Sequence, residues 1–185
     1  MNKIIIIGLG NPGKKYENTP HNAGFSALDL FIEKNSLPTF SLVKKLQSEI
    51  SEAMIGGIKV ILVKPLTFMN LSGTAIKKVL SEIKPQSESL IKLKIIVIHD
   101  DIDIPIGDIK ISENRGAAGH KGVLSIIKEL GTKDFTRVRI GILPDKKYTT
   151  TDIFVLRRLP EKEKNLLKKG VQSAVSEIER LTNKK

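Results

Sequence analysis

Residues 3–9 read K-I-I-I-I-G-L, a short apolar run built on four consecutive isoleucines. β-branched residues favour strands, and an uninterrupted apolar run of this length is typical of a strand buried on both faces. The run leads into Gly10-Asn11-Pro12-Gly13, whose composition indicates a turn. We therefore predict a central strand of an α/β sheet, with a loop at its carboxyl end, where open α/β sheets usually hold their sites.

The same glycines match a dinucleotide-binding fingerprint, because Gly8 to Gly13 read G-x-G-x-x-G. That fingerprint requires a helix that begins at the third glycine, so that its N-terminus faces a pyrophosphate. Residues 14–20 read K-K-Y-E-N-T-P and lack helical periodicity, while Pro12 has no N–H to offer a phosphate. Asp29 has a spacing suited to a ribose-binding acid, but it falls in an amphipathic helical pattern. We interpret the glycines as turn residues.

Apolar runs and helical periodicity alternate along the rest of the chain, which indicates an α/β fold. Further strands are predicted over 49–54, 58–63, 93–98, 109–111 and 135–142. The strands at 49–54 and 58–63 are predicted to form a hairpin around Gly56-Gly57. Helices are predicted over 22–34, 75–83, 119–130 and 161–181, and polar loops over 85–89 and 146–151. Repeats and linkers are absent from the sequence, so residues 1–185 are interpreted as one domain.

Composition limits the classes of function. The chain has no cysteine, which suits a reducing compartment, and it starts with neither a signal peptide nor a membrane-spanning run, so a cytoplasmic location is expected. A net charge of +11 favours a polyanionic partner, although a lysine-rich surface that serves only solubility gives the same charge. Because aromatic residues make up only 4%, a nucleic acid is expected to be held by its backbone.

Three segments combine the end of an apolar run with a cluster of polar residues: 11–22, 67–70 and 99–103. If these strands lie side by side, the segments share one crevice containing a histidine, a carboxylate and two carboxamides. Such a set suits hydrolysis by water, because a histidine near its neutral pKa accepts the proton of water. A buried aspartate fixes the histidine tautomer, and carboxamide N–H groups stabilise the developing oxyanion.

Each of these residues also has a simpler interpretation. His21 alone is more often a capping or core-edge histidine, and His99 and His120 are assigned structural roles. Asp101 and Asp103 suit Asx turns, and the alternating Arg137 and Arg139 suit a solvated strand face. Met69 is most simply a core residue. The histidine spacings match no common metal-ligand pattern.

Four ordered motifs resemble bacterial peptidyl-tRNA hydrolase: G-L-G-N-P-G-x-x-Y-x-x-T-x-H-N-A-G at 8–24, K-P-x-T-F-M-N-x-S-G at 64–73, H-D-D-I-D-I-P-x-G at 99–107 and G-H-K-G-V at 119–123. The resemblance covers nearly the whole chain. It implies hydrolysis of the ester between a peptide and the 3′ ribose of tRNA, which frees tRNA from peptides dropped by stalled ribosomes. It also implies a compact monomer with a twisted mixed, largely parallel sheet flanked by helices, and no metal or cofactor.

The resemblance assigns roles to individual residues. His21 matches the general base, Asp100 the carboxylate that orients it, and Asn11 the residue that distinguishes a peptidyl ester from a free aminoacyl ester. The positions matched to substrate binding are Tyr16, Phe68, Met69 and Asn70 for the peptide and 3′ end, and Arg139, helped by Lys110 or Arg115, for a tRNA phosphate.

Two positions depart from the family pattern. Pro20 stands where an arginine is usual, which stiffens the approach to His21 and removes one charge. Lys121 stands where an asparagine usually helps to position water and substrate. A charged lysine donates hydrogen bonds but cannot accept one, so Lys121 is assigned to substrate binding and not to catalysis.

Two other functions fit parts of the pattern. A non-catalytic RNA-binding protein of the same fold is the main alternative, and the presence of His21, Asp100, Asn11 and Asn70 argues against it. A hydrolase of small esters is the other, and it gives no reason for a net charge of +11. Salt dependence of activity separates them, because phosphate contacts weaken steeply with ionic strength.

Overall fold

A computed structural model describes residues 3–83, 93–143 and 154–183. Its strands are β1 (Lys3–Gly8), β2 (Ser41–Val43), β3 (Ser48–Ile55), β4 (Ile58–Pro65), β5 (Leu93–Pro105), β6 (Ile109–Glu113) and β7 (Thr136–Leu143). Its helices are α1 (Ala23–Lys34), α2 (Ser72–Ile83), α3 (Lys121–Leu130) and α5 (Glu161–Asn183). Short 3-10 helices are η1 (Lys14–Tyr16), η2 (Pro20–Asn22), η3 (Lys44–Leu46) and η4 (Met69–Leu71).

The strands form one seven-stranded sheet in the order β2-β3-β4-β1-β5-β7-β6. β1 lies at the centre and runs parallel to both β4 and β5, and β5 runs parallel to β7. β2, β3 and β6 are antiparallel to their neighbours, so the sheet is mixed. The predicted fold class, a single α/β domain with a mixed, largely parallel sheet flanked by helices, is confirmed.

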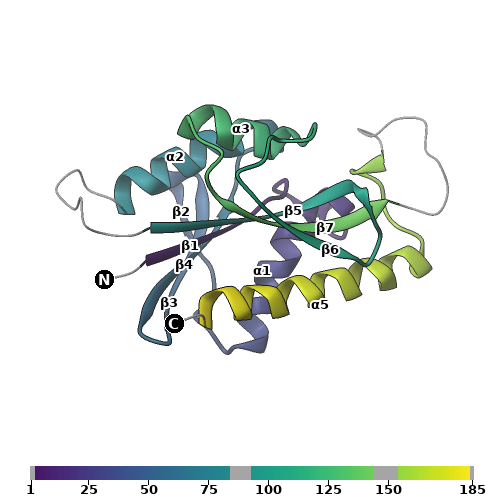
Figure 1. Ribbon diagram of the computed structural model, residues 1–185, viewed down its shortest axis with the longest axis horizontal. Helices are drawn as coiled ribbons and strands as arrows, with labels where there is room; N and C mark the ends of the chain where they lie inside the picture. The colour runs from purple at the N-terminus through teal and green to yellow at the C-terminus, as the bar shows by residue number, and fades with distance from the viewer. Residues whose placement is uncertain (1–2, 84–92, 144–153, 184–185) are drawn as a thin grey trace.

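Helices cover both faces of the sheet, with α2 and α3 on one face and α1 and α5 on the other (Figure 1). The isoleucines of β1 serve both faces because successive side chains of a strand point in opposite directions. Ile4 and Ile6 pack in the cluster that contains residues of α1 and α5, while Ile5 and Ile7 pack in the cluster that contains residues of α2 and α3. This double burial explains why the run at 4–7 has no polar residue.

The hairpin predicted around Gly56-Gly57 is present, and both glycines have positive φ, at 55° and 80°. Several elements differ from the sequence prediction. The edge strand β2 was not predicted, β5 continues past Ile98 to Pro105, and β6 reaches Glu113. The loops predicted at 85–89 and 146–151 lie outside the described residues.

The structure contradicts the dinucleotide fingerprint, as the sequence analysis expected. Gly13 is followed by η1, and α1 begins only at Ala23, so the third glycine does not open an α-helix as the fingerprint requires. Asp29, the candidate ribose-binding acid, instead forms an ion pair with the buried Lys64. Among the described residues, no helix is long and apolar enough to cross a membrane.

Gly24 allows the first turn of α1 to pack directly on the ends of two strands. A Cβ atom at this position would lie 2.4 Å from the carbonyl oxygen of Ile98 and 2.4 Å from the amide nitrogen of Leu9. Both contacts are with backbone, which cannot move aside as a flexible side chain would. Gly24 therefore sets how closely α1, and His21 just before it, approach β1 and β5.

Gly24→Ala is expected to lower the free energy of unfolding by about 1–3 kcal/mol, the usual cost of overpacking a tight contact. Thermal denaturation measures the effect. Gly116→Ala is the matched control, because a Cβ at Gly116 meets no atom within 4 Å and its φ is not positive. Equal melting temperatures for the two variants would contradict this account of the α1 contact.

Candidate active site

The three polar segments predicted to share a crevice do meet: those after β1 and β4 lie beside the part of β5 that continues past Ile98. The amide N–H of Met69, which follows β4, donates a hydrogen bond of 2.8 Å to Oδ1 of Asn11, which follows β1. His21 Nδ1 lies 2.9 Å from Oδ1 and 3.0 Å from Oδ2 of Asp100, which is in β5. The site is therefore assembled by the pairing of β1 with its two parallel neighbours.

His21 is held in place through its backbone as well as its ring. It lies in η2, which begins at Pro20, and its amide N–H donates to the carbonyl oxygen of Val155 at 2.9 Å. A proline is well tolerated at the first position of a helix, because its fixed φ suits the turn and its missing N–H is not needed there. Pro20, the first departure from the family pattern, is thus accommodated without displacing His21.

Asp100 is a buried carboxylate that stays ionised. Only 2% of the residue is exposed, and burial alone would raise the pKa of its carboxyl group. The positive potential of His21 and His120, together with hydrogen bonds from both rings, outweighs burial and holds the pKa of Asp100 well below its usual value. An ionised Asp100 accepts the Nδ1–H of His21 and fixes the orientation of that ring.

His120 lies in the site, which the sequence pattern did not predict. The prediction of a structural role is correct in part, because His120 is the N-cap residue of α3 and its Nδ1 accepts from the Val123 amide. However, Nε2 of His120 also lies 2.9 Å from Oδ1 of Asp100. The sequence analysis placed His120 within a helix predicted over 119–130, whereas α3 begins at Lys121, and nothing in the sequence links His120 to Asp100.

His99 is fully buried beside this cluster. Its Nδ1 donates to the backbone carbonyl of Asp100 at 2.6 Å, and its ring lies 4.6 Å from that of His120. Burial, and then the neighbouring His120, lower the pKa of His99 well below 6.5. His99 is therefore a neutral packing residue behind the site, as its structural interpretation requires.

His21, Asp100 and His120 could each offer one ligand atom to a metal ion, and these atoms lie within 4.8 Å of one another. In the structure, however, both ring nitrogens that face Asp100 are engaged in hydrogen bonds with its carboxylate. Those nitrogens must carry protons to donate, whereas metal ligation requires their lone pairs. The arrangement fits a hydrogen-bonded cluster, and we assign it no metal.

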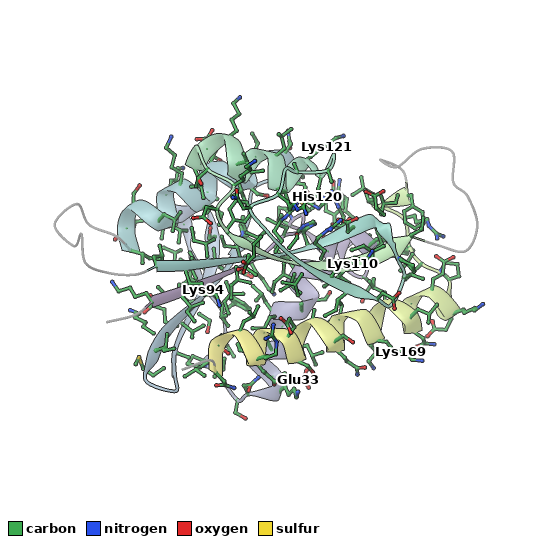
Figure 2. All side chains as sticks on the ribbon, viewed as in Figure 1. Glu33, Lys94, Lys110, His120, Lys121 and Lys169 are labelled. Atoms are coloured by element: carbon green, nitrogen blue, oxygen red, sulfur yellow. The ribbon has the colours of Figure 1, made fainter. Side chains whose placement is uncertain are left out.

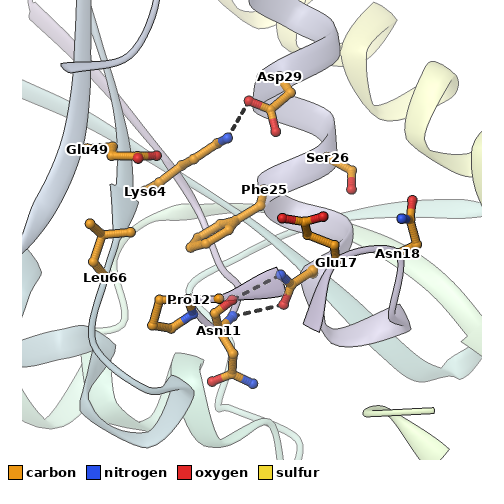
Figure 3. Close-up of a pocket in the computed structure, with 12 residues that line it drawn as sticks. Asn11, Pro12, Glu17, Asn18, Phe25, Ser26, Asp29, Glu49, Lys64 and Leu66 are labelled. Atoms are coloured by element: carbon orange, nitrogen blue, oxygen red, sulfur yellow. Dashed lines mark hydrogen bonds and ion pairs between the residues drawn. The ribbon is translucent and has the colours of Figure 1, made fainter. Parts of the chain in front are cut away.

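Asn11 is fixed by three hydrogen bonds. Its backbone N–H donates to Oδ1 of Asn22 at 2.8 Å, and Nδ2 of Asn22 donates back to the Asn11 carbonyl at 3.0 Å. In Figure 3 the Asn11 side chain points away from Lys64 and Asp29. Because Met69 N–H occupies its Oδ1, the group that Asn11 presents to a ligand is the Nδ2 amide donor.

The residues predicted to bind the peptide lie near Asn11, and they differ in how exposed they are to solvent. The rings of Tyr16 and Phe68 meet edge to face at 6.4 Å, and Phe68 is 54% exposed. Asn70 is exposed in η4, next to Met69. The side chain of Met69 is only 4% exposed and packs in the core, so Met69 contributes to the site mainly through its backbone N–H.

Two cavities lie at this end of the sheet. One, of about 240 Å³, is lined by His21, Asp100, His120 and Lys121 together with neighbouring residues. The other, of about 380 Å³, lies beside Asn11 and Asn22 and contains the Lys64–Asp29 ion pair (Figure 3). The cavity that holds the His21–Asp100 pair is the one suited to chemistry.

Basic residues lie on the β6–β7 edge next to the site. Nε of Arg139 donates to Asp101 at 2.8 Å, and Asp101 also accepts the Asp103 amide at 2.9 Å, which confirms the predicted Asx turn. Lys110 is the partner of Arg139 in the β6–β7 register. Figure 2 labels Lys110 on the strands and Lys121 at the start of α3.

Arg137, on the same strand face as Arg139, is not solvated as one interpretation of the sequence predicted. It is 2% exposed, and its Nη1 has no hydrogen-bond partner among the described residues. Burial, and then the nearby charge of Arg139, lower the pKa of Arg137 below its usual value. The strand therefore carries a positive charge that the surrounding protein only partly compensates.

Comparisons with known proteins agree on one family. The family model described as peptidyl-tRNA hydrolase matches residues 5–185. The peptidyl-tRNA hydrolase of Thermodesulfovibrio yellowstonii is 43% identical over 179 residues, covering 95% of this chain and 90% of that protein. That of Aquifex aeolicus is 40% identical over 179 residues, covering 95% and 90%. A crystal structure of peptidyl-tRNA hydrolase from Acinetobacter baumannii superposes with a TM-score of 0.83 at 30% identity, covering 96% of this chain and 87% of that one.

A histidine hydrogen-bonded to a buried carboxylate, in a cavity of an α/β sheet, is consistent with hydrolysis. With the comparisons, the class is that of carboxylic ester hydrolases. The chain belongs to the peptidyl-tRNA hydrolase family, whose enzymes hydrolyse peptidyl-tRNA in translation.

The neutral His99 makes stability depend on pH. In the unfolded chain His99 takes up a proton below its ordinary pKa of 6.5, whereas in the folded chain it does not. Protons therefore favour the unfolded state, and stability falls as pH drops below 6.5. His99→Asn removes this titration, while the asparagine amide can replace Nδ1–H as the donor to the Asp100 carbonyl.

Urea unfolding at about pH 7.5 and about pH 5 is expected to show a steeper loss of stability for wild type than for His99→Asn, by up to ~1.4 kcal/mol per pH unit. The variant's own cost in packing appears equally at both pH values and cancels in the comparison. Parallel losses in the two proteins would show that His99 is not held neutral by the fold.

Proposed function

We propose that His21 is the general base of peptidyl-tRNA hydrolysis, that Asp100 orients it, and that water is the nucleophile. The observation that supports this is the bond of His21 Nδ1 to both oxygens of Asp100, at 2.9 and 3.0 Å. A neutral imidazole that donates through Nδ1 has its lone pair on Nε2. That nitrogen is then the atom that takes a proton from water as water attacks the ester carbonyl.

The remaining side chains bind the two parts of the substrate in this proposal. Asn11 donates its Nδ2–H to the peptide chain beside the ester, and Asn70 supplies a second carboxamide contact. Tyr16 and Phe68 line the cleft for the peptide and the 3′ end, and the exposure of Phe68 supports this role. Lys121, the first residue of α3, lines the cavity of the His21–Asp100 pair and serves there as a cationic donor to the substrate.

The acceptor stem of tRNA lies along the β6–β7 edge in this proposal. Arg139 and Lys110 face each other across the two strands, and the buried Arg137 adds charge beneath them. Arg115 contributes to the same positive potential, since its charge also acts on the pKa of Arg137. A phosphate at this edge compensates charges that Asp101 alone does not balance.

We further propose that the protein acts as a cytoplasmic monomer, in keeping with a chain that has no cysteine.

Incubation with a blocked aminoacyl-tRNA beside its unblocked counterpart tests the base and the substrate together. Wild type is expected to release only the blocked amino acid. His21→Ala is expected to bind the blocked substrate with similar affinity but to cleave it roughly a hundredfold or more slowly, because a general base contributes at least that factor.

Filter binding and circular dichroism of His21→Ala control for loss of affinity and of fold. Wild-type turnover by the folded variant would remove His21 as the base. Tight binding by wild type without any release would instead support the RNA-binding alternative.

The salt dependence of kcat/KM tests the phosphate contact. Activity on peptidyl-tRNA is expected to fall linearly in a double-logarithmic plot against salt concentration, as phosphate contacts require. Arg139→Gln is expected to reduce the magnitude of that slope by about one. Lys169→Gln is the matched control, because it also removes one positive charge, but from α5, which covers the face of the sheet opposite α2 and α3 (Figure 2). Equal slopes for the two variants would place the tRNA elsewhere.

A further inference from the structure

Asp100 is contacted by two histidine rings from different elements. His21 approaches from η2 and His120 from the start of α3, and their ring centroids lie 5.1 Å apart. Oδ1 of Asp100 lies 2.9 Å from a nitrogen of each ring, while Oδ2 lies 3.0 Å from His21 alone. The pair of His21 and Asp100 is thus part of an imidazole–carboxylate–imidazole arrangement.

The hydrogen bonds of His120 determine which of its nitrogens carries the proton. The Val123 amide is a donor and lies 3.3 Å from Nδ1, so Nδ1 must present its lone pair. A neutral imidazole has one N–H, which must then be on Nε2, the atom that faces Asp100. The helix cap therefore makes His120 an N–H donor to the carboxylate.

This donor differs from His21 in what it can do. His21 exchanges a proton during the proposed reaction, whereas His120 is held in one tautomer by the first turn of α3. Its N–H stabilises the ionised form of Asp100 and restrains Oδ1, the oxygen that also lies 2.9 Å from His21 Nδ1. The same N–H partly neutralises the negative charge of Asp100, so that less of this charge acts on His21.

We propose that His120 is a positioning residue for the hydrolysis, which fixes the Asp100 carboxylate through Nε2–H and thereby limits how strongly Asp100 favours protonation of His21. The inference rests on the proposed role of His21 as base. It assigns α3 a part in the chemistry, because the same helix turn that sets the His120 tautomer also sets the distance to Asp100.

Other charged or titratable groups lie next to this cluster, and the test must leave them unchanged. His99 and Asp101 are its neighbours on β5, Arg137 and Arg139 lie on β7, and Lys121 follows His120 on α3. Substitution of His120 alone leaves all five in place. A change in pH dependence is therefore attributable to an interaction that His120 makes, either its bond to Asp100 or its cap of α3.

Two substitutions separate the cap from the bond to Asp100. His120→Asn places an amide oxygen near the position of Nδ1, so the cap is retained, but it is too short to reach Asp100. His120→Gln places an amide nitrogen near the position of Nε2, so the bond to Asp100 is retained, but glutamine is a poor N-cap. Each variant therefore keeps one of the two interactions of His120 and loses the other.

The acid limb of the kcat/KM profile is the readout. In His120→Asn it is expected to move to higher pH by about half a unit, because an unshared Asp100 charge favours the protonated form of His21. Activity at about pH 6, relative to about pH 8.5, then falls roughly threefold compared with wild type. His120→Gln is expected to keep the wild-type limb and to show the lower melting temperature of the two.

Wild-type acid limbs in both variants would overturn the proposal while leaving His21 as the base. Equal shifts in both would mean that the cap, and not the bond to Asp100, matters, and would overturn it too. If His21→Ala retains activity, the proposed function itself fails, which is a different result.

The tautomer of His120 can be measured in the wild-type protein, independently of any variant. Nitrogen-15 NMR of the histidine rings at about pH 8 distinguishes the two neutral tautomers, which coordinates alone assign only through their hydrogen bonds. The proton is expected on Nε2 of His120 and on Nδ1 of His21. A proton on Nδ1 of His120 would rule out the proposed donor.

Discussion

The hydrogen bond between His21 and Asp100 joins residues 79 positions apart, and it exists only because β1 and β5 are adjacent and parallel. Their register pairs Gly8 with Ile98, so the loop that follows β1 begins level with the part of β5 that contains Asp100. Gly24 then lets α1 begin against the Ile98 carbonyl, which directs η2 over Asp100. Strand pairing, helix packing and the catalytic geometry are therefore one constraint.

The site combines charges that an isolated buried residue would not retain. Asp100 remains ionised because two imidazole N–H groups compensate its burial, and Arg139 is balanced by Asp101. Arg137 lacks such a partner at Nη1 among the described residues. The charges are thus nearly balanced around His21 and Asp100 and less so along β7, which separates the part of the site proposed to perform the chemistry from the part proposed to bind a polyanion.

Much of the fold could be predicted from local pattern. The isoleucine run of β1, the hairpin glycines and the helical periodicity of α1 and α5 each carry their own signal. β2 carries almost none, because it has three residues and no buried side chain. The end of β5 was missed because Asp101 and Asp103 indicate a loop, although the alternation of aspartate and isoleucine there is typical of a strand. Pairing with β7 through Asp101, and again at Pro105, decides between the two.

The site was predictable to the extent that strand ends converge. His21, Asp100 and Asn11 follow from polar residues at the ends of buried runs, and the structure brings these segments together. The part of His120 could not be predicted, because it depends on the exact start of α3 and on a contact across 20 residues. The buried state of Arg137 was missed for a similar reason, since alternation along a strand indicates a shared face but not whether that face is covered.

The hydrogen bonds that fix Asn11 have a consequence for substrate selectivity. Oδ1 of Asn11 accepts the Met69 amide N–H, so the Asn11 side chain cannot exchange its oxygen and nitrogen positions without breaking that bond. It therefore offers a substrate only an N–H group. A peptide presents a carbonyl oxygen that accepts this hydrogen. A tRNA charged with a single amino acid presents an ammonium group, which has hydrogens but no lone pair. If Asn11 contacts the substrate as proposed, the backbone amide of Met69 would in this way let the enzyme spare the charged tRNAs that translation requires.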